Sequence, residues 1–402
     1  MRRGTIWITA LFVATLSLGT DEFVIAGVLN RVADDLQISP GVTGQLVTAY
    51  AFAFALGAPV LGVWADRFPR KNTLVSGLLL FAVANVVCAL ASDFAPLLIL
   101  RIIAGLSAAV VSTTAFTAAA EGAPDGRQGS YLSVVTAGLT VALFSGVPLG
   151  TWMAGVMTWR ATFVMIAAVA LLAAGVIAAS LPHLSGSRSR TLRERVAPLR
   201  NPGVLRMVGS IFLCGGGGLM FYTYLGPLTR YAFGDDSELT MFLLIVGIVG
   251  VASALLGGIL SDRFGPRSAR ISILAGHSAA LTAIGGAVLM GAPLWAAAIG
   301  IGAWSIFAWA LNPPMQASTI AAAPDAAMTA VSLNISGLYA GTAIAAALGG
   351  IVVDSVGVQA IPFVAAASLL CACLLAAPTV TARRACTEDV MDAHDHCPAR
   401  SA

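Results

Sequence analysis

Twelve long apolar stretches, separated by short polar breaks, dominate this sequence. A helix that crosses a bilayer needs about 20 mainly apolar residues. Only 10% of the 402 residues are charged, whereas soluble proteins carry about 25%. We therefore predict a polytopic membrane protein, and a net charge of +3 gives no reason to expect a nucleic-acid partner. The stretches lie near residues 7–29, 42–65, 73–91, 95–119, 130–155, 160–181, 205–229, 240–260, 271–290, 293–321, 329–352 and 360–379.

The two halves of the chain repeat each other. GVWADRFPRK begins at Gly62 and GILSDRFGPR begins at Gly258, and APD occurs at Ala123 and again at Ala323. Both pairs fall between equivalent spans, which predicts a parallel repeat about an axis along the membrane normal. We expect an all-α membrane protein of two six-helix bundles around a central cavity. The expected bounds are 1–182 for the first bundle, 183–203 for a central loop, 204–380 for the second bundle and 381–402 for a tail.

Basic residues are unevenly divided between the two sides of the predicted spans. If the N-terminus is cytoplasmic, eighteen Arg and Lys residues lie inside, three lie outside, and Arg101 lies within a span. Basic residues prefer the cytoplasmic side, which predicts that both termini and the central loop are cytoplasmic. The first apolar run is too long for a cleavable signal peptide. Arginine outnumbers lysine 21 to 1, which favours a bacterial origin and hence the inner membrane.

Two acidic residues stand side by side in the first span, within TLSLGTDEFVIAGVLN. A carboxylate at the membrane centre costs roughly 2.5 kcal/mol or more, so it indicates a functional site. Asp21 and Glu22 point about 100° apart on a helix, so they cannot face one cavity equally. The alternative is that this helix ends early and that both acids lie at the outer surface.

Arg101, in LRIIAGLSAA of the fourth span, is the only basic residue well inside a span. Such an arginine needs an acidic or carbonyl partner. Alternatively, it can extend to the outer interface, because it lies only two turns into the span. Glu121, at the other end of the same span, can simply face water.

The duplicated G-x-x-x-D-R loop resembles the signature of the major facilitator superfamily, and the resemblance covers nearly the whole chain. It implies a latch that closes one face of a transporter. In the first copy, Gly62 lets a neighbouring helix approach, Asp66 interacts with the positive end of a helix, and the basic residues stay at the surface. The alternative is a set of ordinary inside-positive charges around a turn. The implied latch residues are Gly62, Asp66, Arg67, Arg70, Lys71, Asp262 and Arg263.

The segment GTDEFVIAGVLNRVADDLQIS resembles the first span of the drug:proton antiporters, which export sugars, purines, nucleosides and chloramphenicol-like drugs. The resemblance implies that Glu22 carries the proton and that Asp21 is auxiliary. Arg101 matches the R-x-x-x-G motif of the fourth span, which the family ties to proton transfer. Both helices line the cavity in this family, so we expect Glu22 to pair with Arg101. Asn30 stands where the family usually has proline.

The fifth span, GLTVALFSGVPLGTWMAG, resembles the glycine-proline motif of the antiporter branch, although Val147 separates the glycine from the proline. Glycines permit close packing, and a proline bends a helix. The variant GVPLG favours export, and the alternative is helix packing without a bearing on direction. The motif residues are Gly138, Gly146, Pro148 and Gly150.

Polar and aromatic residues of the second half predict a wall that contacts substrate. Aromatic rings and amides can hold a planar, weakly polar compound, and W-x-L-x-P-x-x-Q followed by APD resembles the purine-type exporters. Equally, tryptophans gather at membrane interfaces and asparagines join helices. His277 is expected to be structural. The candidates are Tyr222, Tyr224, Trp309, Asn312, Gln316, Asn334 and Tyr339.

The sequence contains no catalytic constellation and no phosphate-binding loop, so we predict neither an enzyme nor a cofactor. His394, His396 and Cys397 in the tail can hold a metal, but an incidental tail without a metal site is the expectation. We predict a monomeric proton-coupled exporter whose partners are a small-molecule substrate, protons and the lipid bilayer. The alternatives are a proton-coupled importer of a small metabolite and a transport-inactive membrane sensor.

Overall fold

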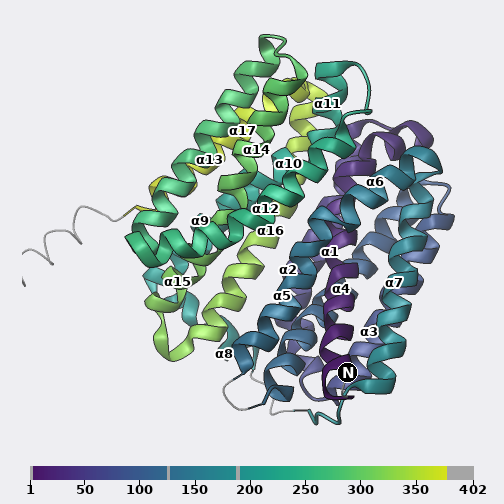
Figure 1. Cartoon of the computed structure of the whole chain (residues 1–402), viewed down its shortest axis with the longest axis vertical. Coiled ribbons are helices and arrows are strands. Elements are labelled where there is room, and N and C mark those ends of the chain that lie inside the picture. The colour runs from purple at the N-terminus through teal and green to yellow at the C-terminus, as the bar shows by residue number, and fades with distance from the viewer. Residues whose placement is uncertain (1–2, 125–126, 187–190, 378–402) are drawn as a thin grey trace, which may run out of the picture.

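The computed structural model describes residues 3–124, 127–186 and 191–377 (Figure 1). Twelve helical segments are long and apolar enough to cross a membrane, and the described residues contain no strand. The prediction of a twelve-span all-α membrane protein is therefore confirmed. The predicted metal-free tail, with His394, His396 and Cys397, lies outside the described residues.

Seven helices form the first six spans, because the fifth span is divided in two. Ser145 separates α5 from α6, directly before the sequence GVPLG. The helices are α1 (Arg3–Leu36), α2 (Pro40–Ala65), α3 (Arg70–Leu90), α4 (Phe94–Gly122), α5 (Gln128–Phe144), α6 (Gly146–Val156) and α7 (Trp159–Ser180).

A short connector precedes the second half, in which two more spans are interrupted. Four consecutive glycines open a π-helical turn in the seventh span, and Pro313 and Pro314 begin a new helix within the tenth, because proline cannot continue the backbone hydrogen-bond ladder. The connector comprises α8 (Leu192–Val196) and η1 (Ala197–Arg200). The second half comprises α9 (Pro202–Cys214), η2 (Gly215–Leu219), α10 (Met220–Thr223), α11 (Leu225–Phe233), α12 (Leu239–Phe264), α13 (Pro266–Leu289), α14 (Leu294–Ala310), α15 (Asn312–Ala322), η3 (Pro324–Ala326), α16 (Ala327–Ser355), η4 (Val358–Ala360) and α17 (Ile361–Ala376).

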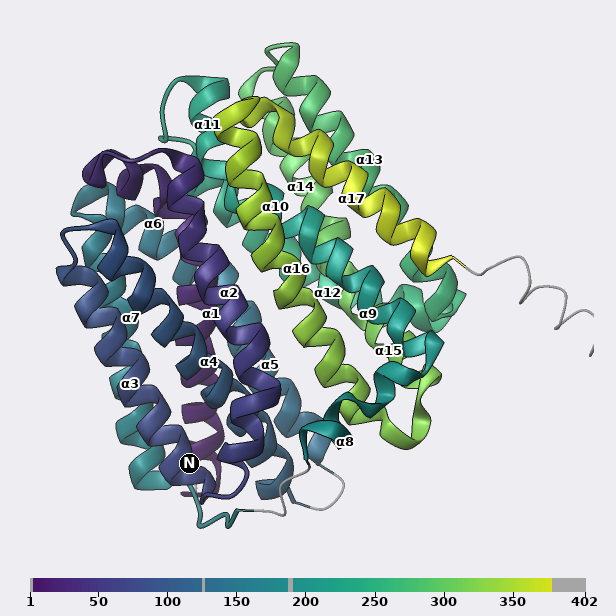
Figure 2. The ribbon, with the colours of Figure 1, turned by 180° about the vertical axis from the view of Figure 1, so that it is seen from behind.

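The two halves form separate bundles that meet along a seam (Figures 1 and 2). Within the seam, α2 packs along α16, and α12 packs against α5 and α6. We call the end at which α1 begins, near α8, the basal end, and the end at which α1 finishes at Leu36 the distal end. The seam therefore brings α2 of the first half next to α16 of the second, and α1 next to α10 and α11.

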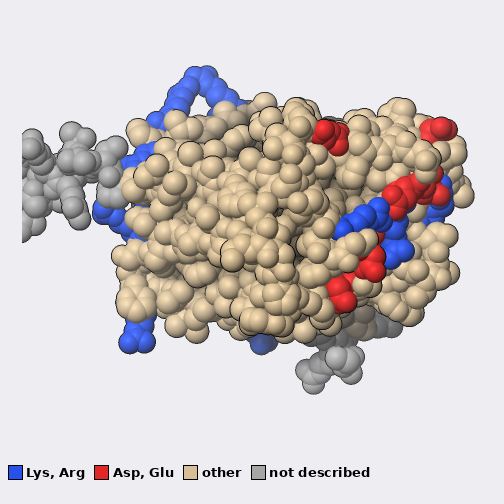
Figure 3. All heavy atoms as spheres, turned by 90° about the horizontal axis from the view of Figure 1, so that it is seen from above, with Lys and Arg blue, Asp and Glu red and all other residues tan. Residues whose placement is uncertain are grey.

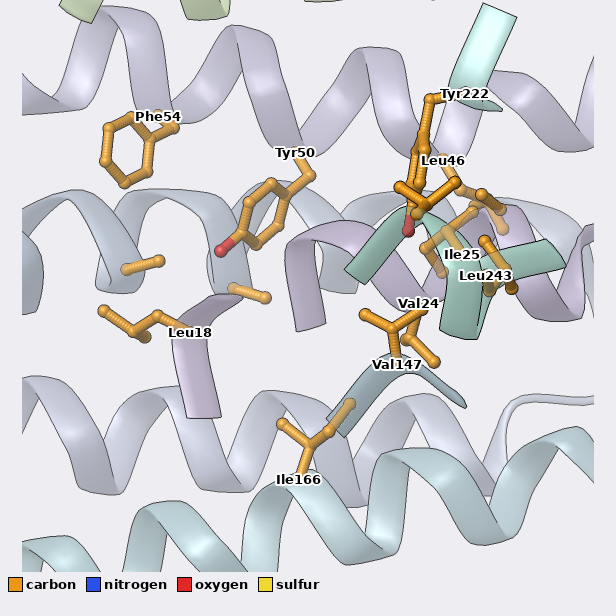
Figure 4. Packing of buried hydrophobic residues seen from close by; sticks show 14 of the residues in the cluster. Leu18, Val24, Ile25, Leu46, Tyr50, Phe54, Val147, Ile166, Tyr222 and Leu243 are labelled. Carbon is orange, nitrogen blue, oxygen red and sulfur yellow. The ribbon is translucent and has the colours of Figure 1, made fainter. Parts of the chain in front are cut away.

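The bundles have an apolar interior and an apolar outer surface. Side chains of both halves meet inside, and Figure 4 shows Tyr50, Val24 and Leu243 among the packed residues. Many large apolar side chains are also exposed outside, such as Leu255 and Leu374. Soluble proteins rarely expose so much apolar surface, whereas lipid chains accommodate it.

Candidate functional site

The two acids of α1 lie in the middle of a long helix. Because α1 runs from Arg3 to Leu36, Asp21 lies roughly 27 Å along it at 1.5 Å per residue. The alternative that the helix ends early, with both acids at the outer surface, is therefore wrong.

Asp21 faces the interior of the first bundle. Its side chain and that of Arg101 on α4 are both 0% exposed, and Arg101 Nη1 lies 2.7 Å from Asp21 Oδ1. The guanidinium also lies over the ring of Tyr50, 4.5 Å from its centroid. The predicted pairing of Arg101 with Glu22 is wrong, and so is its extension to the interface, because the rotation of α1 turns Asp21 toward α4.

Glu22 faces the other way, into a cavity between the two halves. The hydroxyl of Tyr339 on α16 donates a hydrogen bond of 2.6 Å to Glu22 Oε2. The cavity has a volume of about 20 Å³, which is room for about one water molecule. Among the described residues that line it, Glu22 is the only one with a carboxylate, and none has a basic side chain. The lining residues are Glu22, Phe23, Ala26, Val47, Tyr50, Ala51, Leu219, Tyr222, Thr223, Tyr339 and Thr342.

Aromatic rings extend the wall of this cavity into the second half. Phe23 meets the edges of Tyr222 and Trp309, with ring centroids 5.7 Å apart in each pair. Of the candidate substrate residues, Tyr222 and Tyr339 line the cavity directly, and Trp309 lies behind Phe23.

The other candidate substrate residues lie elsewhere. The hydroxyl of Tyr224 donates to the carbonyl of Ala346 at 2.7 Å, and the amide of Asn334 lies 3.5 Å from the carbonyl of Met207. Both side chains thus join helices. Asn312 and Gln316 are half-buried on α15 and do not line the cavity.

A cluster of charges lies at the basal end of the first half. Arg70 is only 1% exposed and contacts Asp66 at 3.3 Å and Glu121 at 3.0 Å. Asp66 also pairs with Arg195 of the connector at 2.5 Å, and Gly62 leaves room for that guanidinium. The expectation that Arg70 stays at the surface is therefore wrong. Glu121 is exposed, as expected, but it also pairs with Arg70. Asp66 pairs with arginine side chains, whereas the sequence predicted an interaction with a helix end.

The second copy of the repeated loop is not built in the same way. Asp262 and Arg263 are exposed, and Arg263 lies over the ring of Phe264. In the part of the chain that the structure describes, neither Asp262 nor Arg263 forms an ion pair, and the same holds for Arg67 and Lys71. The repeat in sequence therefore does not extend to the ion pairs.

The glycines of the fifth-span motif hold α1 in place. A methyl group added to Gly138, Gly146 or Gly150 would collide with Thr15, Thr20 or Val24 of α1. These contacts follow α1 over more than two turns, and Pro148 is buried in the same stretch of α6. The motif thus fixes the helix that carries Asp21 and Glu22.

A network that the sequence did not predict joins the halves at the distal end. Arg230 pairs with Asp34 of the first half at 2.8 Å and with Asp236 at 2.7 Å. Asn30 donates to Asp236 at 2.7 Å. Hydrogen bonding to Asp34 and then to Asp236 raises the pKa of Arg230 above its ordinary value, so this arginine stays charged. Figure 3 looks onto this end, where acidic and basic side chains lie side by side. The one signal of this network in the sequence was Asn30, which stands where the family usually has proline.

We expect Asp34→Asn to loosen the distal end, because asparagine cannot form the ion pair with Arg230. Ion pairs at partly exposed positions contribute about 0.2–1 kcal/mol. Loss of one corresponds to about a 1.5- to 5-fold rise in the fraction of molecules whose distal end is open. Asp35→Asn is the matched control, since Asp35 pairs with Arg160 inside the first half.

The measurement is labelling of Val47→Cys, a residue of the cavity wall, by an impermeant maleimide in a background without other cysteines. Faster labelling in Asp34→Asn alone is expected. Equal rates in the two variants would contradict the assignment.

Known transporters resemble this chain in sequence. The family model described as "Major Facilitator Superfamily" matches residues 11–284. The Bacillus subtilis (strain 168) protein named "Uncharacterized MFS-type transporter YbcL" is 30% identical over 363 residues, which cover 90% of this chain and 92% of that protein. The "Chloramphenicol resistance protein" of Streptomyces lividans is 33% identical over 275 residues, which cover 66% of this chain and 68% of that protein.

Solved structures share the fold at lower identity. A bacterial homologue of the human lysosomal transporter Spinster, in an inward-facing and unoccupied conformation, matches with a TM-score of 0.75 and 18% identity, over 94% of this chain and 96% of that one. The xylose transporter XylE from E. coli, in a partially occluded inward-open conformation, matches with a TM-score of 0.73 and 15% identity, over 93% and 97%.

Proposed function

The chain belongs to the major facilitator superfamily and is a multi-pass membrane transporter, and from this premise we propose that it exports a small organic compound in exchange for protons. The observation that carries the proposal is Glu22: among the described residues that line a cavity shared by both halves, it is the only one with a carboxylate, and none has a basic side chain. A carboxylate there can bind either a proton or a hydrogen-bond donor of the substrate. Such competition for one group is what exchange requires.

The proposed orientation has the basal end in the cytoplasm of a bacterium, with the protein in the inner membrane and both termini inside. Positive residues favour the cytoplasmic side. Arg67, Lys71 and Arg263 lie at the basal end, whereas the distal end carries acids such as Asp34 and Asp236. This distribution supports the same orientation as the basic residues of the whole sequence.

In the proposed cycle, substrate enters from the basal side while Glu22 releases its proton to the cytoplasm. The halves then rock, the ion pairs of Arg230 at the distal end break, and the cavity opens outward. A proton from outside binds Glu22 and favours the release of substrate. The Asp66–Arg195 pair is proposed to help close the basal side and to rearrange during the return.

The proposed substrates are compounds with an aromatic or apolar body. The rings of Phe23, Tyr50 and Tyr222 around the cavity support this class, because such rings bind apolar surface while phenols also form hydrogen bonds. The likeness to the Streptomyces lividans chloramphenicol resistance protein makes chloramphenicol-type drugs the first compounds to test, followed by nucleosides and sugars.

Uptake into everted membrane vesicles with an acidic interior tests this function. The proposal predicts that at least one compound accumulates inside, and that an ionophore that collapses the pH gradient abolishes the accumulation. Vesicles without the protein are the control. Accumulation only in right-side-out vesicles, together with protons, would contradict export and indicate a symporter.

A further inference from the structure

One hydrogen bond ties the two halves together in the middle of the bundle, and it involves the proposed proton carrier. Tyr339 on α16 donates to Glu22 on α1, 317 positions away in the sequence. Among the described residues, the other side-chain hydrogen bonds that join the two bundles lie at the distal end, at Asn30, Ser39 and Arg230. The bond to Glu22 is therefore the polar link at the depth of the cavity.

The hydroxyl of Tyr339 is held in a fixed position. Its ring stacks on Phe54 of α2, with centroids 3.9 Å apart and planes at 19°. The stack crosses the seam between α2 and α16, so it belongs to the same contact between the halves. A phenylalanine in place of Tyr339 would keep the stack and remove only the hydroxyl.

Glu22 has no second hydrogen-bond donor in the part of the chain that the structure describes. The charged groups that act on it are Asp21 and Arg101, and these pair with each other inside the first bundle. The phenols of Tyr50 and Tyr222 line the same cavity without a hydrogen bond to Glu22. The bond from Tyr339 is thus the hydrogen bond by which Glu22 contacts the second half.

We propose that Tyr339 is the coupling residue of this transporter. It holds the halves together when Glu22 is ionised and no substrate is bound. The inference rests on the proposed proton exchange. A hydrogen bond to a carboxylate is about twice as strong as a neutral one, so protonation of Glu22 weakens the link. A substrate that brings its own O–H or N–H group to Glu22 displaces Tyr339 and releases the halves.

This arrangement prevents an uncoupled step that would dissipate the substrate gradient. If an empty, deprotonated carrier could rock freely, substrate would move down its own gradient without a proton moving in return. The bond between Tyr339 and Glu22 blocks that step and leaves the protonated and the substrate-bound carriers free to move. It also specifies the substrate class, which is an apolar or aromatic compound with a hydroxyl, amide or amine donor.

The test compares Tyr339→Phe with Tyr224→Phe in proteoliposomes. Tyr224→Phe is the matched control, because it removes a phenol that lies outside the cavity and donates to the carbonyl of Ala346 within the second half. The measured quantities are downhill efflux of a compound found in the vesicle assay, without a pH gradient, and accumulation with one. In Tyr339→Phe, we expect efflux to rise about tenfold or more and accumulation to fall. Tyr224→Phe should behave as wild type.

Glu22→Gln separates this inference from the proposed function. In that background the carboxylate is gone, so adding Tyr339→Phe should not raise efflux further. If Glu22→Gln loses driven accumulation while Tyr339→Phe keeps tight coupling, the role of Tyr339 is wrong and proton exchange through Glu22 stands. If Glu22→Gln retains driven accumulation, the proposed carrier itself is wrong.

Phe54→Leu provides a second variant for the case in which Tyr339→Phe does not reach the membrane. It removes the stacked ring and leaves the tyrosine in place, so efflux should rise by less than in Tyr339→Phe. Unchanged efflux in Phe54→Leu, or an equal rise in Tyr224→Phe, would overturn the inference.

Discussion

Replacement of Arg101 by methionine is expected to lower the free energy of unfolding by about 3–5 kcal/mol, because it leaves the buried Asp21 carboxylate without its partner. Both side chains of the pair are fully buried, so water cannot solvate the remaining charge. The measurement is thermal unfolding of the purified protein in detergent, which should show a much lower midpoint than wild type.

The double variant Asp21→Leu with Arg101→Met is the matched control. An apolar pair of similar volume often replaces a buried ion pair at little cost. Here Asp21 Oδ2 and Arg101 Nε also lack partners within the described structure, so the ion pair is incompletely satisfied. Most of the lost stability should return in the double variant. If the double variant instead loses as much stability as the two single variants together, the two side chains act independently.

Glu22→Gln is expected to abolish accumulation driven by a pH gradient. With one proton exchanged per substrate, a difference of one pH unit can sustain about a tenfold accumulation, and this should fall to equilibrium in the variant. Glutamine keeps the shape and can still accept a hydrogen bond from Tyr339, so downhill movement of substrate should persist. The measurement is uptake into everted vesicles with and without the gradient.

Asp21→Asn is the control for this prediction, since it changes the neighbouring acid and leaves the cavity wall intact. Asp21 is paired within the first bundle, so driven accumulation should persist in the fraction of protein that folds. Loss of accumulation in Asp21→Asn together with its retention in Glu22→Gln would assign the proton to Asp21 and reject our account.

Hydropathy and spacing were enough to predict the fold. Twelve spans follow from runs of apolar residues, because a bilayer requires helices of a fixed length. The offset between Gly62 and Gly258 indicated two related halves. The breaks between α5 and α6, at η2 and before α15 were harder to predict from the sequence. Residues such as Gly215 and Pro313 permit a break in a helix without determining its position.

The sequence also predicted that Asp21 and Glu22 point in different directions, but not which of them meets Arg101. That depends on how α1 is rotated against α4, and the rotation is set by close packing at glycines such as Gly138. The 100° step between neighbouring residues fixes the angle between the two acidic side chains. It does not fix which helix either side chain faces.

Contacts between the halves were the least predictable part of the site. Arg230 and Asp34 are nearly 200 residues apart, and only the packing of the two bundles brings them together. The partner of Asp66 was missed for a similar reason, because Arg195 lies in a connector whose path no periodic pattern indicates. Tyr339 was recognised as a candidate from its type and span, but its bond to Glu22 crosses the seam.

Release of protons on substrate binding tests the central claim most directly. The purified protein in weakly buffered detergent would be mixed with a saturating compound from the vesicle assay while a pH indicator is followed. If substrate and proton compete for Glu22, linkage requires that binding releases protons. We predict release from wild type and from Asp21→Asn, and none from Glu22→Gln. Release that persists in Glu22→Gln, with substrate still bound, would contradict the account.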